Sequence, residues 1–388
     1  MYNIKLYDKV APAGAKAFNP SKYTLSEDVE KPDGILVHST VLHDIELNPE
    51  LKSIVRIGAG VNTIPVEKCT EKGICVFNCP GGNANAVKEL ALAALIMAMR
   101  NGFDSMEWVK SLPPEETEAG NKVEKGKSAF RGPELRGKTI LIIGVGAIGS
   151  RMARICKHMD MNVIGYDPYL PDNRRNELAQ YLTFVDTMEE KLPEADIVTV
   201  HCPLNDETRG MIAEKEISLM KDGVYLLNYA RGPILDEAAV CSALESGKIK
   251  AFATDFPTPK QMRMAHVVFT PHLGAGTPEA DIDCALMAAR QTIDYIENGN
   301  ITNSVNMPNI ALPRANGARV CIFHKNRVGM LGEITDIVTG MGLNIENLVN
   351  KARGDYAYTL LDFDTAVPAE LEASLSKIAD TIRIRVIS

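Results

Sequence analysis

Short apolar runs and amphipathic segments alternate along most of the chain. In its middle, the apolar run over 139–143 has the length and β-branched content of a buried strand. A helical pattern over 148–159 and a second apolar run over 162–166 follow it. The order strand, helix, strand predicts a βαβ unit with two parallel strands.

The same alternation continues on both sides of this unit and predicts parallel sheets. On the amino-terminal side we expect a buried helix over 85–100, preceded by strands at 2–7, 34–38, 54–57 and 74–77. On the carboxyl-terminal side we expect a long helix over 278–298, preceded by strands at 197–201, 223–228, 252–255 and 267–270. We expect the charged stretch 110–127 to be a solvated excursion, that is, a segment that leaves the domain and is exposed to solvent.

The segment 317–388 has a pattern of its own. We expect strands at 319–324, 344–350, 356–363 and 382–386, with helices at 330–340 and 369–379. This order, βαββαβ, is that of a ferredoxin-like unit. The Asn- and Pro-rich residues 299–316 that precede it read as a linker.

Composition narrows the class of protein. A chain of 388 residues, 45% hydrophobic and 24% charged, suits two or three globular domains. The net charge of −8 argues against a nucleic-acid partner, and eight cysteines without a C-x-x-C pair argue against a disulfide framework or metal site. We expect a cytoplasmic protein without a membrane partner, because no signal-peptide pattern opens the sequence and the longest apolar run, 90–99, is short.

Three glycines separate the central strand from its helix: Gly144, Gly146 and Gly149. In a dinucleotide-binding motif the first allows a tight turn, the second lets the backbone approach a pyrophosphate, and the third lets the helix pack on the strand. Asp167 ends the next strand, where a carboxylate can bind the adenosine ribose and repel a 2′-phosphate. Together these features predict NAD as the cofactor.

Two chemically suited side chains follow other strands of the same unit. Arg231, in NYARGPILD, offers a planar fork that matches a carboxylate. His272, in TPHLGAG, is of the residue type that most often transfers protons near neutral pH. Because ligands bind at the carboxyl ends of parallel strands, this pair predicts hydride exchange with a 2-hydroxy or 2-oxo acid. The turns at 38–40, 58–62 and 78–85 are candidate substrate loops.

Six stretches make the chain similar to the D-isomer-specific 2-hydroxyacid dehydrogenases. They are RIGAGVNTIPV (56–66), FNCPGGNANAVKEL (77–90), ELRGKTILIIGVGAIGS (134–150), VHCPLNDETRG (200–210), NYARGPILDE (228–237) and TPHLGAGTPEA (270–280). The resemblance implies two doubly wound α/β domains: a flavodoxin-like substrate domain (1–98 and 282–308) and a Rossmann-like NAD-binding domain (99–281). It points to the members that oxidise D-3-phosphoglycerate to 3-phosphohydroxypyruvate, the first step of serine biosynthesis.

The same resemblance assigns roles by position. It implies that Arg231 binds the substrate and that His272 transfers the proton. The positions matching cofactor contacts are Ala147, Ile148, Asp167, Cys202, Tyr229, Ala230, Asp255, Gly274 and Ala275, together with Arg231 and His272. The positions expected to bind the substrate are His38, Ser39, Ala59, Gly60 and Arg231.

After a linker at 309–316, residues 317–388 resemble an ACT domain, a small-molecule regulatory module. FHKNRVGMLGEI (323–334) and GLNIEN (342–347) look like serine-binding signatures, which implies that L-serine binds His324, Asn326 and Asn344 and lowers activity. Such modules commonly pair edge to edge, so we expect a homodimer or homotetramer.

One departure from the family concerns the partner of the catalytic histidine. The usual D-V-F-x-x-E-P, whose Glu hydrogen-bonds that histidine, is D-F-P-T-P here, and Pro259 falls at the Glu position. Without a carboxylate, His272 is expected to be less basic unless another group substitutes. Glu279 is one candidate, and Lys88 and Lys260 are weaker ones.

A second departure concerns the substrate. The strand-end arginine usual before Ser39 is His38, which weakens phosphate recognition, although Ser39 and Lys88 can compensate. Two other functions therefore stay open. His38 favours a dehydrogenase for a different acid, such as 2-hydroxyglutarate. The missing Glu favours a dinucleotide-sensing regulatory protein on the same fold, like the C-terminal-binding-protein corepressors.

Overall fold

The computed structural model describes residues 1–112, 116–315 and 317–388. Their packing divides them into two compact units, Met1–Gly82 with Pro278–Ser388, and Asn83–Thr277. The expected domain boundaries at 98 and 282 differ from these, because α3 (Ala84–Met99) packs in the core of the second unit. Residue 316 of the expected linker and residues 113–115 of the expected excursion lie outside the described residues.

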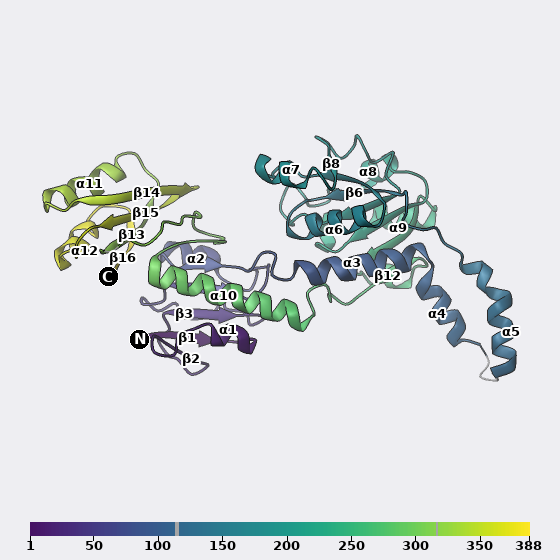
Figure 1. The fold of residues 1–388 in the computed structure, drawn as a ribbon, viewed down its shortest axis with the longest axis horizontal. Coiled ribbons are helices and arrows are strands. Elements are labelled where there is room, and N and C mark those ends of the chain that lie inside the picture. The colour runs from purple at the N-terminus through teal and green to yellow at the C-terminus, as the bar shows by residue number, and fades with distance from the viewer. Residues whose placement is uncertain (113–115, 316) are drawn as a thin grey trace. The chain divides into compact units, whose positions relative to one another are not determined.

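The first unit contains a five-stranded parallel sheet in the order β2-β1-β3-β4-β5, which is the flavodoxin-like order. Figure 1 labels its strands β1, β2 and β3. The strands are β1 (Tyr2–Leu6), β2 (Tyr23–Ser26), β3 (Gly34–Val37), β4 (Ser53–Arg56) and β5 (Cys75–Phe77). Its helices are α1 (Pro12–Lys16), α2 (Val66–Glu71) and α10 (Pro278–Asn298). One core packs the sheet on α10 and another packs it on α2, so both faces are covered.

The second unit contains a seven-stranded parallel sheet in the order β12-β11-β10-β9-β6-β7-β8. The strands are β6 (Thr139–Ile143), β7 (Asn162–Tyr166), β8 (Thr183–Phe184), β9 (Ile197–Val200), β10 (Val224–Asn228), β11 (Ile249–Thr254) and β12 (Val267–Phe269). Successive residues of β6 enter different cores: Ile140 packs with α3 and α6 (Ala147–His158), and Leu141 packs with α8 (Glu214–Leu219) and α9 (Glu237–Glu245). Both predicted sheets are therefore doubly wound, as expected.

The remaining elements of the second unit are short or follow α3. They are α4 (Gly102–Lys110), α5 (Glu116–Gly126), α7 (Asp172–Leu178) and the single-turn 3₁₀ helices η1 (Lys127–Phe130), η2 (Gly232–Ile234) and η3 (Gln261–Arg263). The described part of the stretch expected to be a solvated excursion is thus helical. The edge strands β2 and β8 were not predicted, because each is short and only partly buried.

Residues 319–387 form the predicted βαββαβ unit inside the first compact unit. Its elements are β13 (Arg319–Lys325), α11 (Met330–Gly340), β14 (Ile345–Arg353), β15 (Tyr356–Phe363), α12 (Ala369–Leu375) and β16 (Thr381–Ile387), with sheet order β14-β15-β13-β16. The two helices cover one face. The other face packs Phe323 and Tyr358 into one core with Tyr295 of α10.

Part of the segment 299–316, which was expected to be a linker, is structured, whereas 311–315 belong to no helix or strand. Ile301 and Ile310 exchange backbone hydrogen bonds, and both side chains are buried. Among the described residues, no helix combines the length and the hydrophobicity needed to cross a membrane.

Candidate active site

Two of the three glycines after β6 have a steric reason to be glycine, and the third borders open space. Gly144 has a φ of 86°, and a Cβ there would lie 2.6 Å from the backbone nitrogen of Cys202. A Cβ on Gly149 would lie 2.0 Å from the Gly144 carbonyl oxygen, so glycine is needed for α6 to pack this closely. A Cβ on Gly146 would meet no described atom within 4 Å. The space before the α6 N-terminus is therefore open and fits a pyrophosphate bound by backbone N–H groups.

Asp167 ends β7 beside this loop. Its carboxylate accepts hydrogen bonds from the backbone nitrogens of Val145 (2.9 Å) and Tyr169 (3.1 Å), which hold it in place. Cys202 follows β9, on the other side of the point where the strand order reverses. Burial and the charge of Asp167 raise the pKa of the Cys202 thiol to about 11, so the thiol is neutral. The carboxylate is placed to accept ribose hydroxyls, which fits NAD.

Arg231 lies in the turn after β10. Asn228, the buried last residue of the strand, shapes this turn, because its side chain donates to the Arg231 carbonyl (2.9 Å) and accepts from Ala230 N (3.1 Å). The Arg231 guanidinium donates to the Ala230 carbonyl at 2.7 Å. Tyr229 and Ala230 are buried, whereas Arg231 is partly exposed. The turn therefore presents the guanidinium at the carboxyl edge of the sheet.

Asp255, which follows β11, holds the loop that carries His272. Its buried carboxylate accepts hydrogen bonds from Thr270 Oγ1, Leu273 N (2.8 Å) and Gly274 N (2.7 Å), and its carbonyl accepts one from His272 N (3.0 Å). His272 has a left-handed φ of 54°, which is uncommon outside glycine and requires support from its surroundings. Asp255 thus holds the backbone of the loop from which the imidazole projects, and His272 itself is exposed.

The neighbouring strands β10, β11 and β12 bring Arg231 and His272 to the same edge of the sheet. Phe256, which was not predicted as a site residue, contacts both of them. Its ring centroid lies 4.6 Å from that of His272 at an interplanar angle of 51°, and Arg231 Cζ lies 5.8 Å from the same ring.

Two of the three suggested substitutes for the missing Glu, Lys260 and Lys88, have other partners. Lys260 pairs with Glu245 (3.8 Å), and Lys88 pairs with Glu89 (3.4 Å). Glu279 belongs to the first unit. Within the second unit, the described residues give the His272 ring an aromatic contact but no hydrogen-bond partner.

In the first unit, Asp8 follows β1 and holds the turn after β3. Its Oδ2 accepts hydrogen bonds from the backbone nitrogens of His38 (2.7 Å), Ser39 (3.0 Å) and Thr40 (3.2 Å). Burial raises the pKa of Asp8, but these hydrogen bonds outweigh burial and leave the pKa below its ordinary value. The strand order reverses between β1 and β3, which is where sheets of this kind bind ligands. His38 and Ser39 are therefore well placed for a substrate.

Arg56, the last residue of β4, was also not predicted. Its Nε donates to the His38 carbonyl (3.1 Å), and its guanidinium lies over Gly58, where a Cβ would be 1.4 Å from Nη1. The turn continues to the predicted residues Ala59 and Gly60. A signal like the one that identified Arg231, an arginine at a strand end with a glycine close behind, was present here too, since Gly58 follows Arg56 by two residues. Arg56 brings a guanidinium close to His38, where the family's usual arginine is missing.

Two of the predicted serine-binding residues lie at the end of β13. His324 is buried, with Nδ1 2.8 Å from the Lys325 carbonyl and Nε2 2.8 Å from Thr359 Oγ1. Burial lowers the pKa of His324, so its neutral form is favoured. Asn326 is exposed and donates to the Gly354 carbonyl at 3.3 Å.

Asn344, the third of these residues, lies at the opposite end of the sheet. It directly precedes β14, whose Ile345 faces Phe363 at the end of β15, whereas His324 faces Ala357 near the start of β15. Six residues of antiparallel strand span about 20 Å. The structure of one chain therefore does not bring the three residues together.

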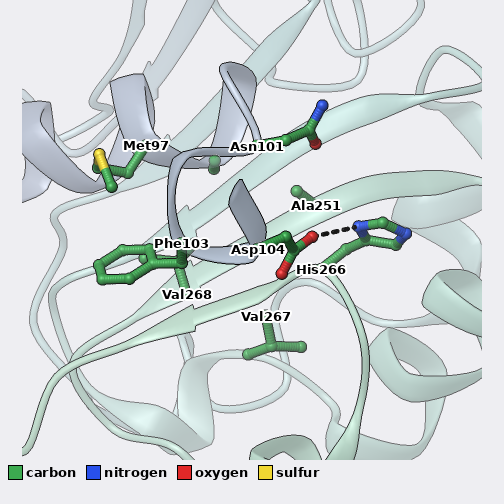
Figure 2. Close-up of a pocket in the computed structure, with 9 residues that line it drawn as sticks. Met97, Asn101, Phe103, Asp104, Ala251, His266, Val267 and Val268 are labelled. Atoms are coloured by element: carbon green, nitrogen blue, oxygen red, sulfur yellow. Dashed lines mark ion pairs between the residues drawn. The ribbon is translucent and has the colours of Figure 1, made fainter. Parts of the chain in front are cut away.

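A small hollow in the second unit lies near the amino ends of β11 and β12 (Figure 2). His266, just before β12, pairs there with Asp104 of α4, with 3.6 Å between Nδ1 and Oδ2. Ligands of parallel sheets bind at the opposite, carboxyl ends of the strands. None of the predicted site residues lines this hollow, and it is not a candidate active site.

Comparison with protein families matches residues 92–274 to the NAD binding domain of the D-isomer specific 2-hydroxyacid dehydrogenases. The D-3-phosphoglycerate dehydrogenase of Haemophilus influenzae is 31% identical over 360 residues, covering 88% of this chain and 83% of that protein. The enzyme of the same name from Archaeoglobus fulgidus is 36% identical over 303 residues, covering 75% of this chain. The chain matches 54% of that relative, about half its length.

Among solved structures, the NAD⁺-bound 3-phosphoglycerate dehydrogenase of Entamoeba histolytica is similar to this chain. The TM-score is 0.61 and the sequence identity is 26%, over 79% of this chain and 98% of that one. The similarity supports the fold described above, with its parallel, doubly wound sheets.

Proposed function

Because the chain belongs to the D-isomer-specific 2-hydroxyacid dehydrogenases, we propose that it is an NAD-dependent enzyme that oxidises D-3-phosphoglycerate to 3-phosphohydroxypyruvate. The observation that carries the proposal is the convergence of Arg231 and His272 at one sheet edge, in the unit that also contains the open glycine loop and Asp167. In this proposal the reaction is the first step of serine biosynthesis.

Each residue has a role that follows from its chemistry. The glycine loop and Asp167 hold NAD, which supplies the hydride acceptor when bound. Arg231 holds the substrate carboxylate, assisted by the backbone at Ala59 and Gly60. His272 accepts the proton of the substrate hydroxyl during oxidation and returns it during reduction.

The phosphate is the part of the substrate least supported by the sequence pattern. We assign it to the turn after β3, with Ser39, His38 and the neighbouring guanidinium of Arg56 as hydrogen-bond donors. Because His38 stands where the family usually has arginine, a different 2-hydroxy acid such as 2-hydroxyglutarate is the second candidate. A dinucleotide-sensing regulatory protein is the third, since the usual Glu is absent near Pro259.

An NADH oxidation assay with three acids separates these functions. Faster reduction of 3-phosphohydroxypyruvate than of 2-oxoglutarate or glyoxylate would support the proposed substrate. Preference for one of the other acids would support the second candidate. Tight NADH binding without turnover of any of the three would contradict the enzymatic proposal and favour a sensor.

Regulation by L-serine belongs to the same proposal. Asn344 is separated from His324 and Asn326 within one chain, so all three can contact one small amino acid only if two copies contribute. β14 lies at the edge of its sheet, which suits pairing with a second copy and a homodimer or homotetramer. Serine would then favour one arrangement of the two copies and lower activity. The expected cytoplasmic location remains a proposal as well.

A further inference from the structure

Phe256 occupies the position between the two side chains to which the proposed chemistry is assigned. Its ring centroid is 4.6 Å from the His272 ring, within the range of aromatic pairs that contribute beyond simple burial. Arg231 Cζ is 5.8 Å from the same ring, within the range of a cation–π contact. One side chain therefore touches both groups.

The local sequence holds this ring in place. The backbone nitrogen of Phe256 donates to Thr254 Oγ1 at 3.0 Å, and Thr254 is buried at the end of β11. Asp255, one residue earlier, holds the His272 loop through its carboxylate and carbonyl. Pro257 follows and restricts the backbone of Phe256 to extended conformations. Neighbouring residues of one turn thus contact the backbone and the ring of His272.

We propose that Phe256 is a positioning residue that orients the imidazole of His272 and the guanidinium of Arg231 relative to each other. The inference rests on the proposed dehydrogenase function. The Phe256 ring restricts the imidazole of His272 by packing. In the family's usual pattern, a glutamate carboxylate restricts the histidine by a directed hydrogen bond instead. The ring faces also attract the guanidinium, so the spacing of the proton carrier and the carboxylate binder depends on a single side chain.

This role predicts how substitutions at position 256 act. Phe256→Leu keeps apolar volume but removes the aromatic face, so both side chains gain rotational freedom. We expect kcat for 3-phosphohydroxypyruvate reduction to fall about tenfold, because small misplacements of catalytic groups are costly. The KM for NADH should stay within about twofold, since the glycine loop and Asp167 are untouched. Phe256→Tyr restores the aromatic face and should recover most of the kcat.

A matched control removes a similar aromatic contact elsewhere in the same unit. The rings of Phe130 and Trp108 lie 5.2 Å apart at 39°, and neither residue belongs to the proposed site. Phe130→Leu should therefore leave kcat unchanged. Thermal unfolding of each variant shows whether a loss of activity reflects a loss of folded protein.

The second measurement is independent of turnover. In an NMR spectrum of imidazole resonances, the His272 signals are identified by their loss in His272→Gln. They should move in Phe256→Leu and stay in place in Phe130→Leu, because an aromatic ring shifts the resonances of groups packed on it. Unchanged His272 signals, or an unchanged kcat in Phe256→Leu, would overturn the proposal.

The two proposals fail in different ways. If the wild type turns over none of the tested acids, the dehydrogenase function fails, and the positions of the His272 signals then decide whether Phe256 packs on the imidazole. If the wild type is active and Phe256→Leu matches it, the function stands and the positioning role is wrong. A loss of kcat that Phe256→Tyr does not recover would also contradict the role of the aromatic face.

Discussion

The edge that carries Arg231 and His272 and the sheet that carries His324 and Asn344 differ in the direction of their strands. In the parallel sheet of the second unit, residues that follow β10, β11 and β12 all emerge at one edge. In the antiparallel sheet of the C-terminal unit, β13 ends where β15 begins, and β14 begins where β15 ends. Strand-end residues converge in the first case and separate in the second.

This difference changes what a single chain can do. The proposed catalytic pair is assembled within one unit, and Phe256 and Asp255 complete its support there. The proposed serine site is not assembled within one chain, because Asn344 lies about 20 Å along the sheet from His324 and Asn326. A chain on its own can therefore present the catalytic pair, whereas a serine site made of all three residues requires a second copy.

The largest expected effect tests the sheet edge at which Arg231 and His272 converge. His272→Ala should lower kcat roughly 10²–10⁴-fold, the usual consequence of removing a general acid–base group. The matched control is His266→Ala, at the other end of β12, which removes a histidine from the hollow of Figure 2 and should leave kcat nearly unchanged. Near-normal turnover of His272→Ala would remove the proposed proton carrier. Both variants are measured by steady-state NADH oxidation.

The next effect concerns how the C-terminal sheet is joined to the rest of the first unit. Arg319 is completely buried, pairs with Asp362 (2.6 and 2.8 Å), and donates to the carbonyl of Asn298 (2.7 Å) at the end of α10. Burial lowers the pKa of the Arg319 guanidinium, but Asp362 outweighs burial and raises it, so the charge is retained.

Arg319→Met leaves the buried carboxylate of Asp362 unpaired and should lower the free energy of unfolding by about 3–5 kcal/mol. Urea unfolding measures the change. Arg327 provides the control, because it pairs with Glu333 and Asp380 at the surface, and its replacement by Met should lower the free energy of unfolding far less. Equal losses of stability in the two variants would show that the buried pair of Arg319 and Asp362 stabilises the protein no more than a surface pair does.

A smaller effect concerns His201, which directly follows β9 and whose Nδ1 atom is buried. Burial lowers the pKa of His201, beside Cys202, to about 4. Between pH 6.5 and 4 the unfolded chain therefore binds more protons at this site than the folded chain, and stability falls as the pH is lowered. His201 should account for a loss of roughly 3 kcal/mol across this range.

The measurement is urea unfolding at several pH values. In His201→Asn the dependence of stability on pH below 6.5 should be shallower than in the wild type. Replacement of the exposed His158 by Gln should leave the dependence unchanged. If stability depends on pH in the same way in all three proteins, His201 is not held neutral by the fold.

The smallest expected effect concerns the proposed serine site of the C-terminal unit. Asn326→Ala and Asn344→Ala should each weaken L-serine binding about tenfold, the value of one lost hydrogen bond to a charged or polar ligand. If the site is shared between two copies, a mixed dimer of these two variants contains one intact site and one site with both defects.

In a freely exchanging equimolar mixture half of the dimers are mixed, and each mixed dimer keeps one of its two sites. Calorimetry with L-serine should therefore find about a quarter of the wild-type number of tight sites per dimer in the mixture, and none in either variant alone. Recovery of tight sites requires that the two variants exchange subunits. Differently tagged chains show whether this exchange takes place. A mixture that binds no better than its components would contradict a site shared between copies.

The apolar pattern determined most of the secondary structure. The strands Thr139–Ile143, Asn162–Tyr166 and Tyr356–Phe363 and the helices Pro278–Asn298 and Met330–Gly340 begin and end where the pattern predicts. The pattern is sufficient there because each element buries a continuous apolar face. It failed for β2 and β8, which are short edge strands, and for 110–127, whose sequence is rich in charged residues and has no continuous apolar run.

The sequence also determined the chemistry of the individual candidates, since three glycines, Asp167, Arg231 and His272 are recognisable from residue type and spacing. Which of them meet was decided by the tertiary structure. The contacts of Asp8 with the turn after β3, of Arg56 with His38 and of Phe256 with His272 join residues from different strands. The separation of Asn344 from His324 follows in the same way from strand direction and register. Neighbours of this kind depend on sheet order, which local periodicity does not encode.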